Sequence, residues 1–329
     1  MIHYLSTAQH AYTLRTFLAS WGHGLRRRIR PLSYETALAG HRVPAGAYLF
    51  SDLERLTPQQ SEQAFALRAA LQRAGWPVLN HPTAALRRYE MLRRLHAAGI
   101  NPFNVYRLVD DPAPQRWPVF LRAENEHSGA QSGLLNDADE LAAAVRQWQA
   151  DGRAREHALV VEFCDTRDAD GLYRKYSVLR FGDRLIPRHL FFGPAWMLKV
   201  GRNLTPEHVA IEAEFLATHP HAQAVRAVFD LARIEYGRID YSVRDGGIVV
   251  WEINTNPHLA TFRDFGGEAR HAVHRRFAAA FGEALADFDR PGPPGPVTWR
   301  EPPRPAWKRW RKAANNTLRD RRARQRHRP

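Results

Sequence analysis

A strand–helix–strand unit between residues 48 and 80 places the strongest constraint on the fold. Residues 48–50 are apolar and have the pattern of a short buried strand. Residues 57–60, Thr-Pro-Gln-Gln, have the pattern of a capping box with proline at the first helical position. Gly75 ends the helical periodicity, and residues 77–79 are apolar again. Two strands joined by one helix pair in parallel, so the sequence predicts an α/β fold.

The remainder of the chain mixes predicted strands and helices, without an internal repeat. Further strands are expected at residues 2–5, 119–122, 158–163, 175–181 and 185–190. Further helices are expected at residues 12–20, 84–98, 137–150, 206–218 and 221–234. Pro187 indicates that its strand lies at a sheet edge or contains a bulge. This mixture predicts an α/β or α+β enzyme-like fold, with an N-terminal α/β domain at residues 1–80 and a larger domain at residues 81–289.

Composition excludes several classes of protein. No run approaches 18 apolar residues, so no transmembrane segment is expected. The first ten residues lack the basic and apolar regions of an export signal. The single cysteine, Cys164, excludes an intramolecular disulfide and a multi-cysteine zinc site. These features favour a cytoplasmic protein.

The net charge of +14 comes mostly from the C-terminal residues 290–329. This segment contains thirteen Lys or Arg and two acidic residues, a net charge of +11. It begins with the proline-rich residues 290–296, which cannot form the interior of a helix or strand. We expect a basic, disordered tail, since it has too few apolar residues for a core. An anionic partner, either a nucleic acid or a membrane surface, is the alternative.

A predicted β-hairpin carries the clearest chemistry. Its strands cover residues 238–243 and 248–254, and Asp245-Gly246-Gly247 supply the turn. A three-residue turn places Asp240 opposite Glu252, with Asn254 on the same face. Two neighbouring carboxylates repel each other unless a cation or a proton lies between them. Hard oxygen ligands of this kind suit Mg²⁺.

Two alternatives remain open at this point. The polar face of the hairpin could simply face solvent, an alternation that is common in antiparallel sheets. A two-residue turn would shift the register by one residue and separate Asp240 from Glu252.

The same hairpin resembles the C-terminal signature of the ATP-grasp superfamily. The matching residues are Gly237-Arg-Ile-Asp240-Tyr and Val250-Trp-Glu252-Ile-Asn254-Thr-Asn256-Pro257. In that family an Asp, a Glu and an Asn at this spacing hold two Mg²⁺ ions on the nucleotide phosphates. The resemblance therefore implies that Asp240, Glu252 and Asn254 are metal ligands, with Mn²⁺ as an alternative to Mg²⁺.

Upstream motifs follow in the family's order, and the resemblance covers roughly residues 45–265. Asn80-His-Pro82 resembles the entry to the ATP-binding region, and residues 117–122 with Ser128-Gly129 and Ser132-Gly133 resemble the strand and loop over the phosphates. Residues 160–164 resemble the hinge that binds adenine, which implies cofactor-binding roles for Glu162, Phe163 and Cys164. The implied fold is ATP-grasp-like, an N-terminal α/β domain and two mixed α+β subdomains that enclose the nucleotide.

The phosphate-binding lysines of the family are atypical in this chain. Arg122 stands on the strand where the family commonly has one lysine, and Arg87, Arg88 and Glu90 occupy the region of the other. Arginine binds phosphate through its planar guanidinium, so Arg122 can replace a lysine.

The strands after the hinge offer further candidates. The resemblance implies that Arg174 is catalytic, that Lys175 contacts the phosphates and that Arg188 is a catalytic cation. The alternative for the first two is an exposed strand edge. His189 and Asn256 are substrate-contact candidates, with a hydrogen-bonded structural histidine and a turn cap as their alternatives.

The resemblance implies an ATP- and Mg²⁺-dependent ligase that joins a carboxylate to an amine or thiol through an acylphosphate, releasing ADP and phosphate. Its substrates would be small molecules or peptides. The alternatives are an ATP-grasp-type kinase and a non-catalytic nucleotide-binding or scaffold protein with a basic docking tail. Neither substrate can be named from the sequence.

Overall fold

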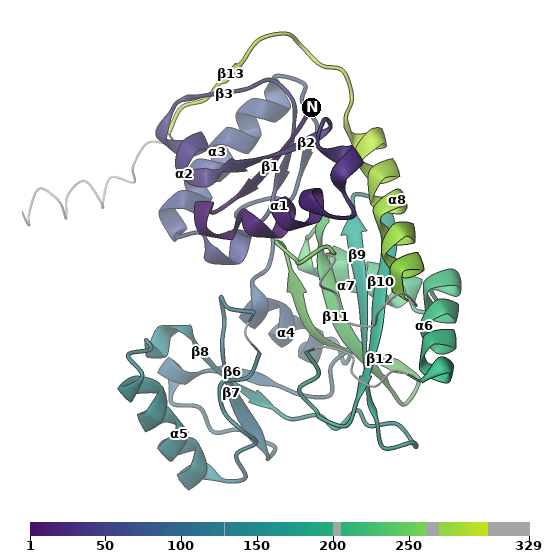
Figure 1. Cartoon of the computed structure of the whole chain (residues 1–329). Coiled ribbons are helices and arrows are strands. Elements are labelled where there is room, and N and C mark those ends of the chain that lie inside the picture. The colour runs from purple at the N-terminus through teal and green to yellow at the C-terminus, as the bar shows by residue number, and fades with distance from the viewer. Residues whose placement is uncertain (128, 200–204, 261–269, 302–329) are drawn as a thin grey trace, which may run out of the picture.

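The computed structural model describes residues 1–127, 129–199, 205–260 and 270–301 (Figure 1). The chain forms three main sheets, of which the first is parallel and the others are antiparallel. No helix in these ranges is long and apolar enough to cross a membrane.

The N-terminal domain is built on the parallel sheet. Its strands are β1 (Ile2–Ser6), β2 (Ile29–Ser33), β4 (Ala47–Phe50) and β5 (Val78–Leu79), in the order β2-β1-β4-β5. Its helices are α1 (Tyr12–Ala19), α2 (Tyr34–Ala39) and α3 (Pro58–Arg73). The capping box of α3 forms as expected, and β4 pairs in parallel with β5. The predicted strand–helix–strand unit is therefore confirmed.

The second sheet forms a separate lobe, at the lower left of Figure 1. It consists of β6 (Val105–Arg107), β7 (Val119–Ala123) and β8 (Ala158–Glu162), in the order β6-β8-β7. Helix α4 (Arg88–Ala97) precedes it, and α5 (Ala138–Ala150) buries Leu141 and Trp148 against β7 and β8.

The third sheet carries the residues of greatest interest. Its strands are β9 (Tyr173–Phe181), β10 (Arg184–Gly193), β11 (Tyr236–Arg244) and β12 (Gly247–Asn254), in the order β10-β9-β11-β12. Helices α6 (Pro206–Thr218), α7 (Ala222–Ala232) and α8 (His271–Phe288) accompany it. Strand β10 lies at the edge, and its register shifts between Pro187 and His189, so Pro187 marks both an edge and a bulge.

The hairpin of β11 and β12 has a shorter turn than expected. Arg244 pairs with Gly247, so the turn contains only Asp245 and Gly246, both with positive φ. A β-bulge between Asp240 and Tyr241 then shifts the register by one residue. Asp240 consequently lies opposite Glu252, as predicted, although the predicted three-residue turn is wrong.

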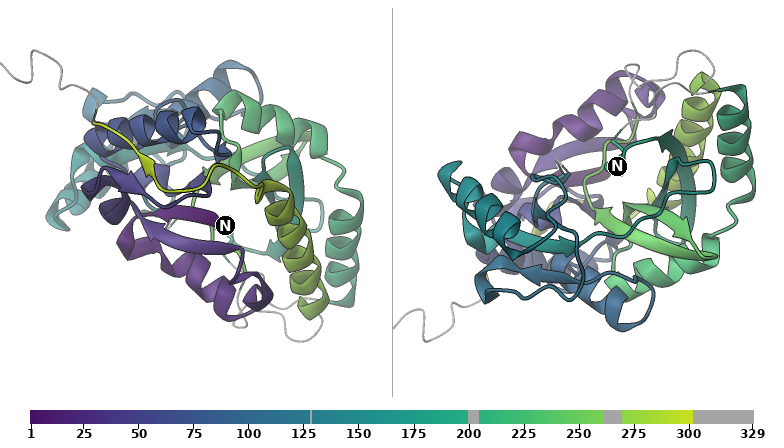
Figure 2. Two further views of the ribbon diagram at one scale, coloured as in Figure 1. Left: turned by 90° about the horizontal axis from the view of Figure 1, so that it is seen from above. Right: turned by 90° about the horizontal axis from the view of Figure 1, so that it is seen from below.

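The start of the C-terminal segment is ordered, which corrects the expectation of disorder from residue 290 onwards. Strand β13 (Val297–Thr298) pairs with β3 (Arg42–Val43), and the Trp299 side chain is only 2% exposed. The segment runs from α8 across the N-terminal domain (Figure 2, left). Residues 302–329, which carry most of the basic tail, lie outside the described residues.

The predicted boundary near residue 80 does not separate two independent cores. One buried cluster joins Ile2 and Phe17 of the N-terminal domain to Phe181 of the third sheet and to Phe277 and Phe281 of α8. The N-terminal sheet therefore packs directly on the third sheet and its last helix.

Candidate functional site

One face of the third sheet gathers charged side chains around Asp240. Side chains alternate along a strand, and Lys175 and Ser177 of β9 lie on the Asp240 side of the sheet. The Ser177 hydroxyl donates to Asp240 Oδ1 at 2.6 Å, and Arg238 Nε donates to the same oxygen at 3.0 Å. Lys175 Nζ lies 3.8 Å from Asp240 Oδ2. Two cations, Lys175 and Arg238, therefore lie beside this carboxylate.

Glu252 lies where the second lobe meets the third sheet. Arg88 of α4 donates to Glu252 Oε2 at 2.7 Å, and Arg122 of β7 donates to the same oxygen at 2.8 Å. Burial opposes the charge of Glu252, but Arg88, His127 and Arg122 outweigh it and hold the pKa of Glu252 well below its usual range. Burial and the neighbouring charge of Arg88 in turn lower the pKa of Arg122 to about 10.

A histidine connects the N-terminal domain to Glu252. This residue, His127, received no role from the sequence motifs. His127 Nε2 lies 2.7 Å from Oε1 of Glu54, which belongs to the 3-10 helix η3 (Leu53–Arg55). Hydrogen bonds from His127 and Thr255 outweigh burial and lower the pKa of Glu54 to about 2. His127 Nδ1 lies 3.7 Å from Glu252 Oε2, so one imidazole connects two carboxylates from different domains.

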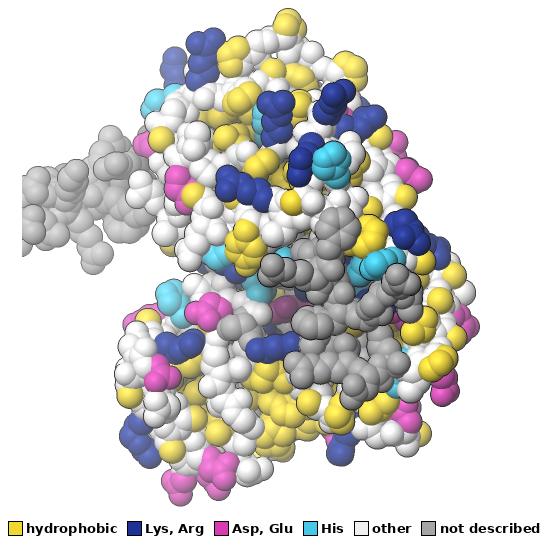
Figure 3. All heavy atoms as spheres, in the orientation of Figure 1, with side chains coloured by type: hydrophobic (Ala, Val, Ile, Leu, Met, Phe, Trp, Pro, Cys, Tyr) yellow, Lys and Arg dark blue, Asp and Glu magenta, His cyan; other side chains and the backbone are white. Residues whose placement is uncertain are grey.

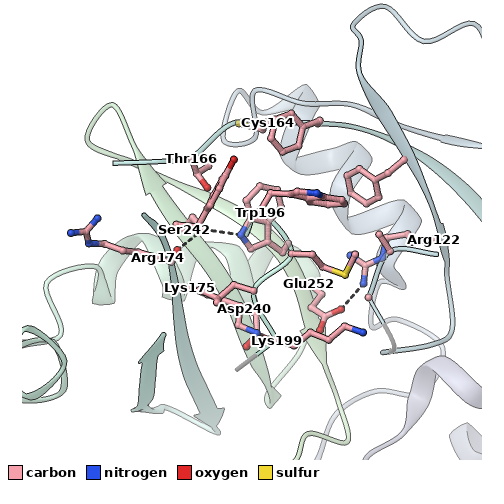
Figure 4. A pocket seen from close by; sticks show the side chains of 18 of the residues that line it. Arg122, Cys164, Thr166, Arg174, Lys175, Trp196, Lys199, Asp240, Ser242 and Glu252 are labelled. Atoms are coloured by element: carbon pink, nitrogen blue, oxygen red, sulfur yellow. Dashed lines mark hydrogen bonds and ion pairs between the residues drawn. The ribbon is translucent and has the colours of Figure 1, made fainter. Parts of the chain in front are cut away.

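A cavity opens beside these charges, with an aromatic end and a cationic end (Figure 4). At the aromatic end the Trp196 ring lies 5.0 Å from that of Phe120 and 5.7 Å from that of Phe163. Cys164 lines the same end. At the other end the cavity is lined by Arg122, Lys175, Lys199, Asp240 and Glu252.

The predicted hinge is present, but one of its residues points elsewhere. Phe163 and Cys164 line the cavity, whereas Glu162 does not. The Glu162 carboxylate is 1% exposed and accepts hydrogen bonds from the backbone N–H of Asn104 at 2.9 Å and the Tyr106 hydroxyl at 2.7 Å. It therefore holds the hinge in place and does not line the cavity, and the cofactor-binding role of Glu162 stays a prediction.

The two predicted catalytic arginines are engaged away from Asp240. Arg174 follows the opposite face of β9 and forms ion pairs with Asp168 at 2.9 Å and Asp170 at 2.6 Å. Arg174 lines the cavity, but Figure 4 shows its guanidinium directed away from Asp240 and Glu252. Arg188 is the bulged residue of β10, and its guanidinium is buried against the Leu259 carbonyl. Arg238, which the sequence analysis did not single out, is the arginine next to Asp240.

The two predicted substrate contacts have different surroundings. His189 is buried, stacks on Phe191 and lies with Nε2 2.8 Å from the Ser177 hydroxyl. Asn256 is also buried, and its Oδ1 accepts from the hydroxyls of Tyr4 at 2.8 Å and Thr13 at 2.6 Å. Asn256 therefore ties the end of the signature to the N-terminal domain, and its amide faces protein groups rather than a cavity.

The oxygen donors of the hairpin fit a magnesium ion. Asp240 and Glu252 are directly opposite each other, and both arginine contacts of Glu252 are to Oε2, not Oε1. The third donor, Asn254 Oδ1, accepts a hydrogen bond from the backbone N–H of Asn256 at 2.8 Å. Two carboxylates and an amide oxygen form a hard donor set suited to Mg²⁺. Within the described ranges no cluster of three or more His, Cys, Asp or Glu residues offers another metal site.

Comparison with known proteins identifies the fold. A scan against protein-family models finds no match, and a search of curated proteins also finds none. Among solved structures, the D-alanine–D-alanine ligase of Bacillus anthracis complexed with ATP is similar at a TM-score of 0.51 and 14% identity, over 87% of this chain and 97% of that chain. A second structure of the ligase from that organism gives the same TM-score and coverage at 15% identity. Similarity at this identity shows the fold alone: the chain shares the fold of these D-alanine–D-alanine ligases, in agreement with the ATP-grasp-like fold expected from its sequence motifs.

Proposed function

We propose that the protein is an ATP- and Mg²⁺-dependent ligase that joins a carboxylate to an amine or thiol through an acylphosphate. The observation that carries the proposal is the Asp240–Glu252 pair at the cationic end of a cavity whose other end is aromatic. An apolar slot suits a nucleobase, and a cationic end suits its phosphates. Solved structures with the same fold are ligases, one of them complexed with ATP.

The residues of the cavity divide naturally between the parts of a nucleotide. The base would lie between Phe120, Phe163 and Trp196, and the phosphates would lie near Arg122 and Lys175. Asp240, Glu252 and Asn254 would hold Mg²⁺, which when bound neutralises phosphate charge.

The proposed reaction has two steps. An oxygen of the substrate carboxylate attacks the γ-phosphorus, the bond from that phosphorus to the β–γ bridging oxygen breaks, and ADP leaves. The amine nitrogen then attacks the acyl carbon, phosphate leaves and the amine loses a proton, which gives the amide. Lys175 and Arg238 flank Asp240 and would stabilise charge on the transferred phosphoryl group.

The test is titration calorimetry of ATP with and without Mg²⁺, comparing the native protein with Glu252→Gln. We expect Mg²⁺-dependent binding that the substitution weakens at least tenfold, about 1.4 kcal/mol. Glu283→Gln, an exposed carboxylate that pairs with Arg184 on the surface, is the matched control and should bind like the native protein. Failure of the folded native protein to bind ATP would refute the proposal.

Product analysis then separates the ligase from its alternatives. ADP, phosphate and an amide or thioester formed from a carboxylate and an amine or thiol would support the ligase. A phosphorylated substrate that accumulates without either product would identify a kinase instead. ATP binding without ADP release across a broad panel of acids and amines would favour a non-catalytic nucleotide-binding protein.

A further inference from the structure

An arginine-rich surface extends from the candidate site across the N-terminal domain. Tyr12, the first residue of α1, is 48% exposed, and its ring centre lies 5.8 Å from that of His258. His258 lines a second cavity, which shares Lys175 and Lys199 with the first. Helix α1 therefore begins directly beside the candidate site.

Helix α1 leads from this point to a group of arginines. Arg15 is exposed and follows Tyr12 by three residues, so the two lie on one face of the helix. Near the other end of the helix, Arg26 Nε donates to the Leu18 carbonyl at 2.8 Å. The eight residues of α1 span about 12 Å, so the arginines after the helix lie about that far from Tyr12. We call the exposed arginines of this surface the arginine track: Arg15, Arg26, Arg27, Arg28 and Arg30.

Positive charge is concentrated in this part of the molecule. Residues 1–56 contain seven arginines and three acids, whereas residues 57–289 contain 28 Lys or Arg and 29 acids. Figure 3 shows Lys and Arg side chains gathered over the N-terminal domain. The three acids are engaged with other groups: Glu35 with the backbone N–H of Ala8, Asp52 with Arg55, and Glu54 with His127. Within the described ranges no arginine of the track forms an ion pair, so the track is a cationic surface open to solvent.

The position of the track favours an elongated anion. Guanidinium groups pair with carboxylates and phosphates alike. A small molecule bound in either cavity does not reach arginines about 12 Å along α1. An extended polypeptide covers the same distance with about four residues. A single elongated ligand can therefore contact the track and enter the candidate site together.

The proposed reaction favours a polypeptide among elongated anions. The reaction joins a carboxylate to an amine or thiol, and polypeptides carry such groups at their ends and in their side chains. The phosphodiester backbone of a nucleic acid carries none of them. Surfaces that bind membranes combine cations with exposed apolar side chains. Of the large apolar side chains exposed in the described ranges, only Tyr12 lies on α1.

We infer that one of the two substrates is a polypeptide with an acidic segment, and that this segment docks on the arginine track while the reacting group enters the site beside His258. This inference rests on the proposed ligase function, and it names the class of substrate. The acidic residues would lie between Arg15 and the arginines at 26–30, and the reacting group would follow past Tyr12.

The first experiment compares ligands of equal length and different charge. Peptides with five glutamates and five neutral residues, in either order, are compared with peptides in which glutamine replaces glutamate. Binding to the full chain is measured by fluorescence anisotropy at about 50 mM salt, where surface charges are weakly screened. In at least one order we expect the acidic peptide to bind tenfold or more tightly than its neutral counterpart.

Two further probes test the other classes of anion. A six-nucleotide oligothymidylate carries five phosphodiester charges, which matches the acidic peptides, and vesicles of phosphatidylserine and phosphatidylcholine present an anionic membrane. Binding of either probe more tightly than the acidic peptide would overturn the inference, in favour of a nucleic acid or a membrane surface.

Variants locate the docked segment. The triple variant Arg15→Gln/Arg27→Gln/Arg28→Gln removes three exposed charges whose side chains form no hydrogen bond or ion pair within the described ranges. It should weaken binding of the acidic peptide at least fivefold. The matched control, Arg321→Gln/Arg322→Gln/Arg324→Gln, removes the same charge from the C-terminal tail and should change the affinity less than twofold. Equal weakening by both variants would overturn the inference, because binding would then follow net charge alone. Thermal unfolding checks that each variant is folded, and a second track variant with Arg30→Gln in place of Arg15→Gln keeps the test valid.

Cross-linking tests the connection between the track and the site. Acidic peptides with a benzophenone at the end of the neutral half should label residues 258–260 or Lys199 in at least one of the two orders. Labelling confined to other surfaces would overturn the inference.

The outcomes separate this inference from the proposed function. The track variant should bind ATP with Mg²⁺ like the native protein, because no arginine of the track lines either cavity. Equal affinity for acidic and neutral peptides would overturn the inference while leaving ATP binding intact. Failure of the native protein to bind ATP would refute the proposed function, whatever the peptides do.

Discussion

Replacing Arg88 tests whether one buried guanidinium joins the second lobe to the third sheet. Its Nη1 donates to the backbone carbonyls of Ala123, Glu124 and Glu126 at 2.7–2.8 Å, and its Nη2 donates to Glu252. Arg88→Met fills a similar volume but removes these four hydrogen bonds and the 3.2 Å contact of Nη2 with His127 Nδ1. It also leaves Glu252 with Arg122 as its remaining arginine partner.

The expected loss of stability follows from these contacts. Breaking a buried charge pair by removing one partner costs about 3–5 kcal/mol. Arg88 is only 7% exposed, so water cannot easily replace the lost donors at the three carbonyls. We therefore expect Arg88→Met to lower the free energy of unfolding by about 3–5 kcal/mol. The neighbouring Arg87→Met removes one hydrogen bond, to the Leu56 carbonyl at 2.7 Å, and should cost about 1 kcal/mol.

The assay is urea unfolding followed by tryptophan fluorescence, with the native protein, both single variants, Glu252→Gln and the Arg88→Met/Glu252→Gln double variant. Comparison is valid where the m value is unchanged. The loss of unfolding free energy in the double variant should be smaller than the sum of the losses in the two single variants, by about 0.5–3 kcal/mol. The reason is that the glutamine of Glu252→Gln carries no charge that would need Arg88 as a partner. An Arg88→Met loss no larger than that of Arg87→Met, or full additivity in the double variant, would refute the reasoning.

Two further predictions concern stability elsewhere in the chain. Trp299→Ala should destabilise the protein by about 3–5 kcal/mol in the same assay, because a buried indole and its hydrogen bond to the Gly40 carbonyl are lost. An unchanged unfolding midpoint would mean that the C-terminal segment does not stabilise the N-terminal domain. His219 has its pKa lowered to about 4 by burial and by the charges of His221 and Arg226, so the stability that its neutral form contributes should be lost as the pH falls from about 6.5 towards 4. His219→Asn, which tolerates the left-handed backbone at this position, should lose less stability than the native protein between pH 7 and pH 4.5; parallel losses in the two proteins would contradict the assignment.

The hairpin shows which structural features a local sequence pattern can predict and which it cannot. Its alternation of polar and apolar residues placed Asp240 opposite Glu252, and the structure confirms that pairing. The turn has two residues rather than three, and the shift this causes is cancelled by the bulge next to Asp240. A bulge inserts one unpaired residue without a distinct local sequence signal. Periodicity could therefore predict the pairing of Asp240 with Glu252, but not the combination of a two-residue turn and a bulge that produces it.

The predicted site residues divide in the same way. Arg122, Lys175, Phe163 and Cys164 line the first cavity, as their positions on strands and hinge suggested. Glu162 does not, because its carboxylate is held by the backbone N–H of Asn104 and the hydroxyl of Tyr106. The resemblance identified the hinge segment, but it could not determine which side chains face the cavity.

By itself the sequence determined what depends on neighbours in the chain: the capped helix α3, the parallel pairing around it, the alternation of the hairpin and the ATP-grasp order of motifs. Only the tertiary structure decided what surrounds Glu252. Arg88 and Arg122 lie 164 and 130 residues before it in the chain, and Glu54 reaches its neighbourhood from another domain through His127. The electrostatics of a carboxylate depend on charges a few ångströms away in space, and no local periodicity encodes which distant cations arrive there.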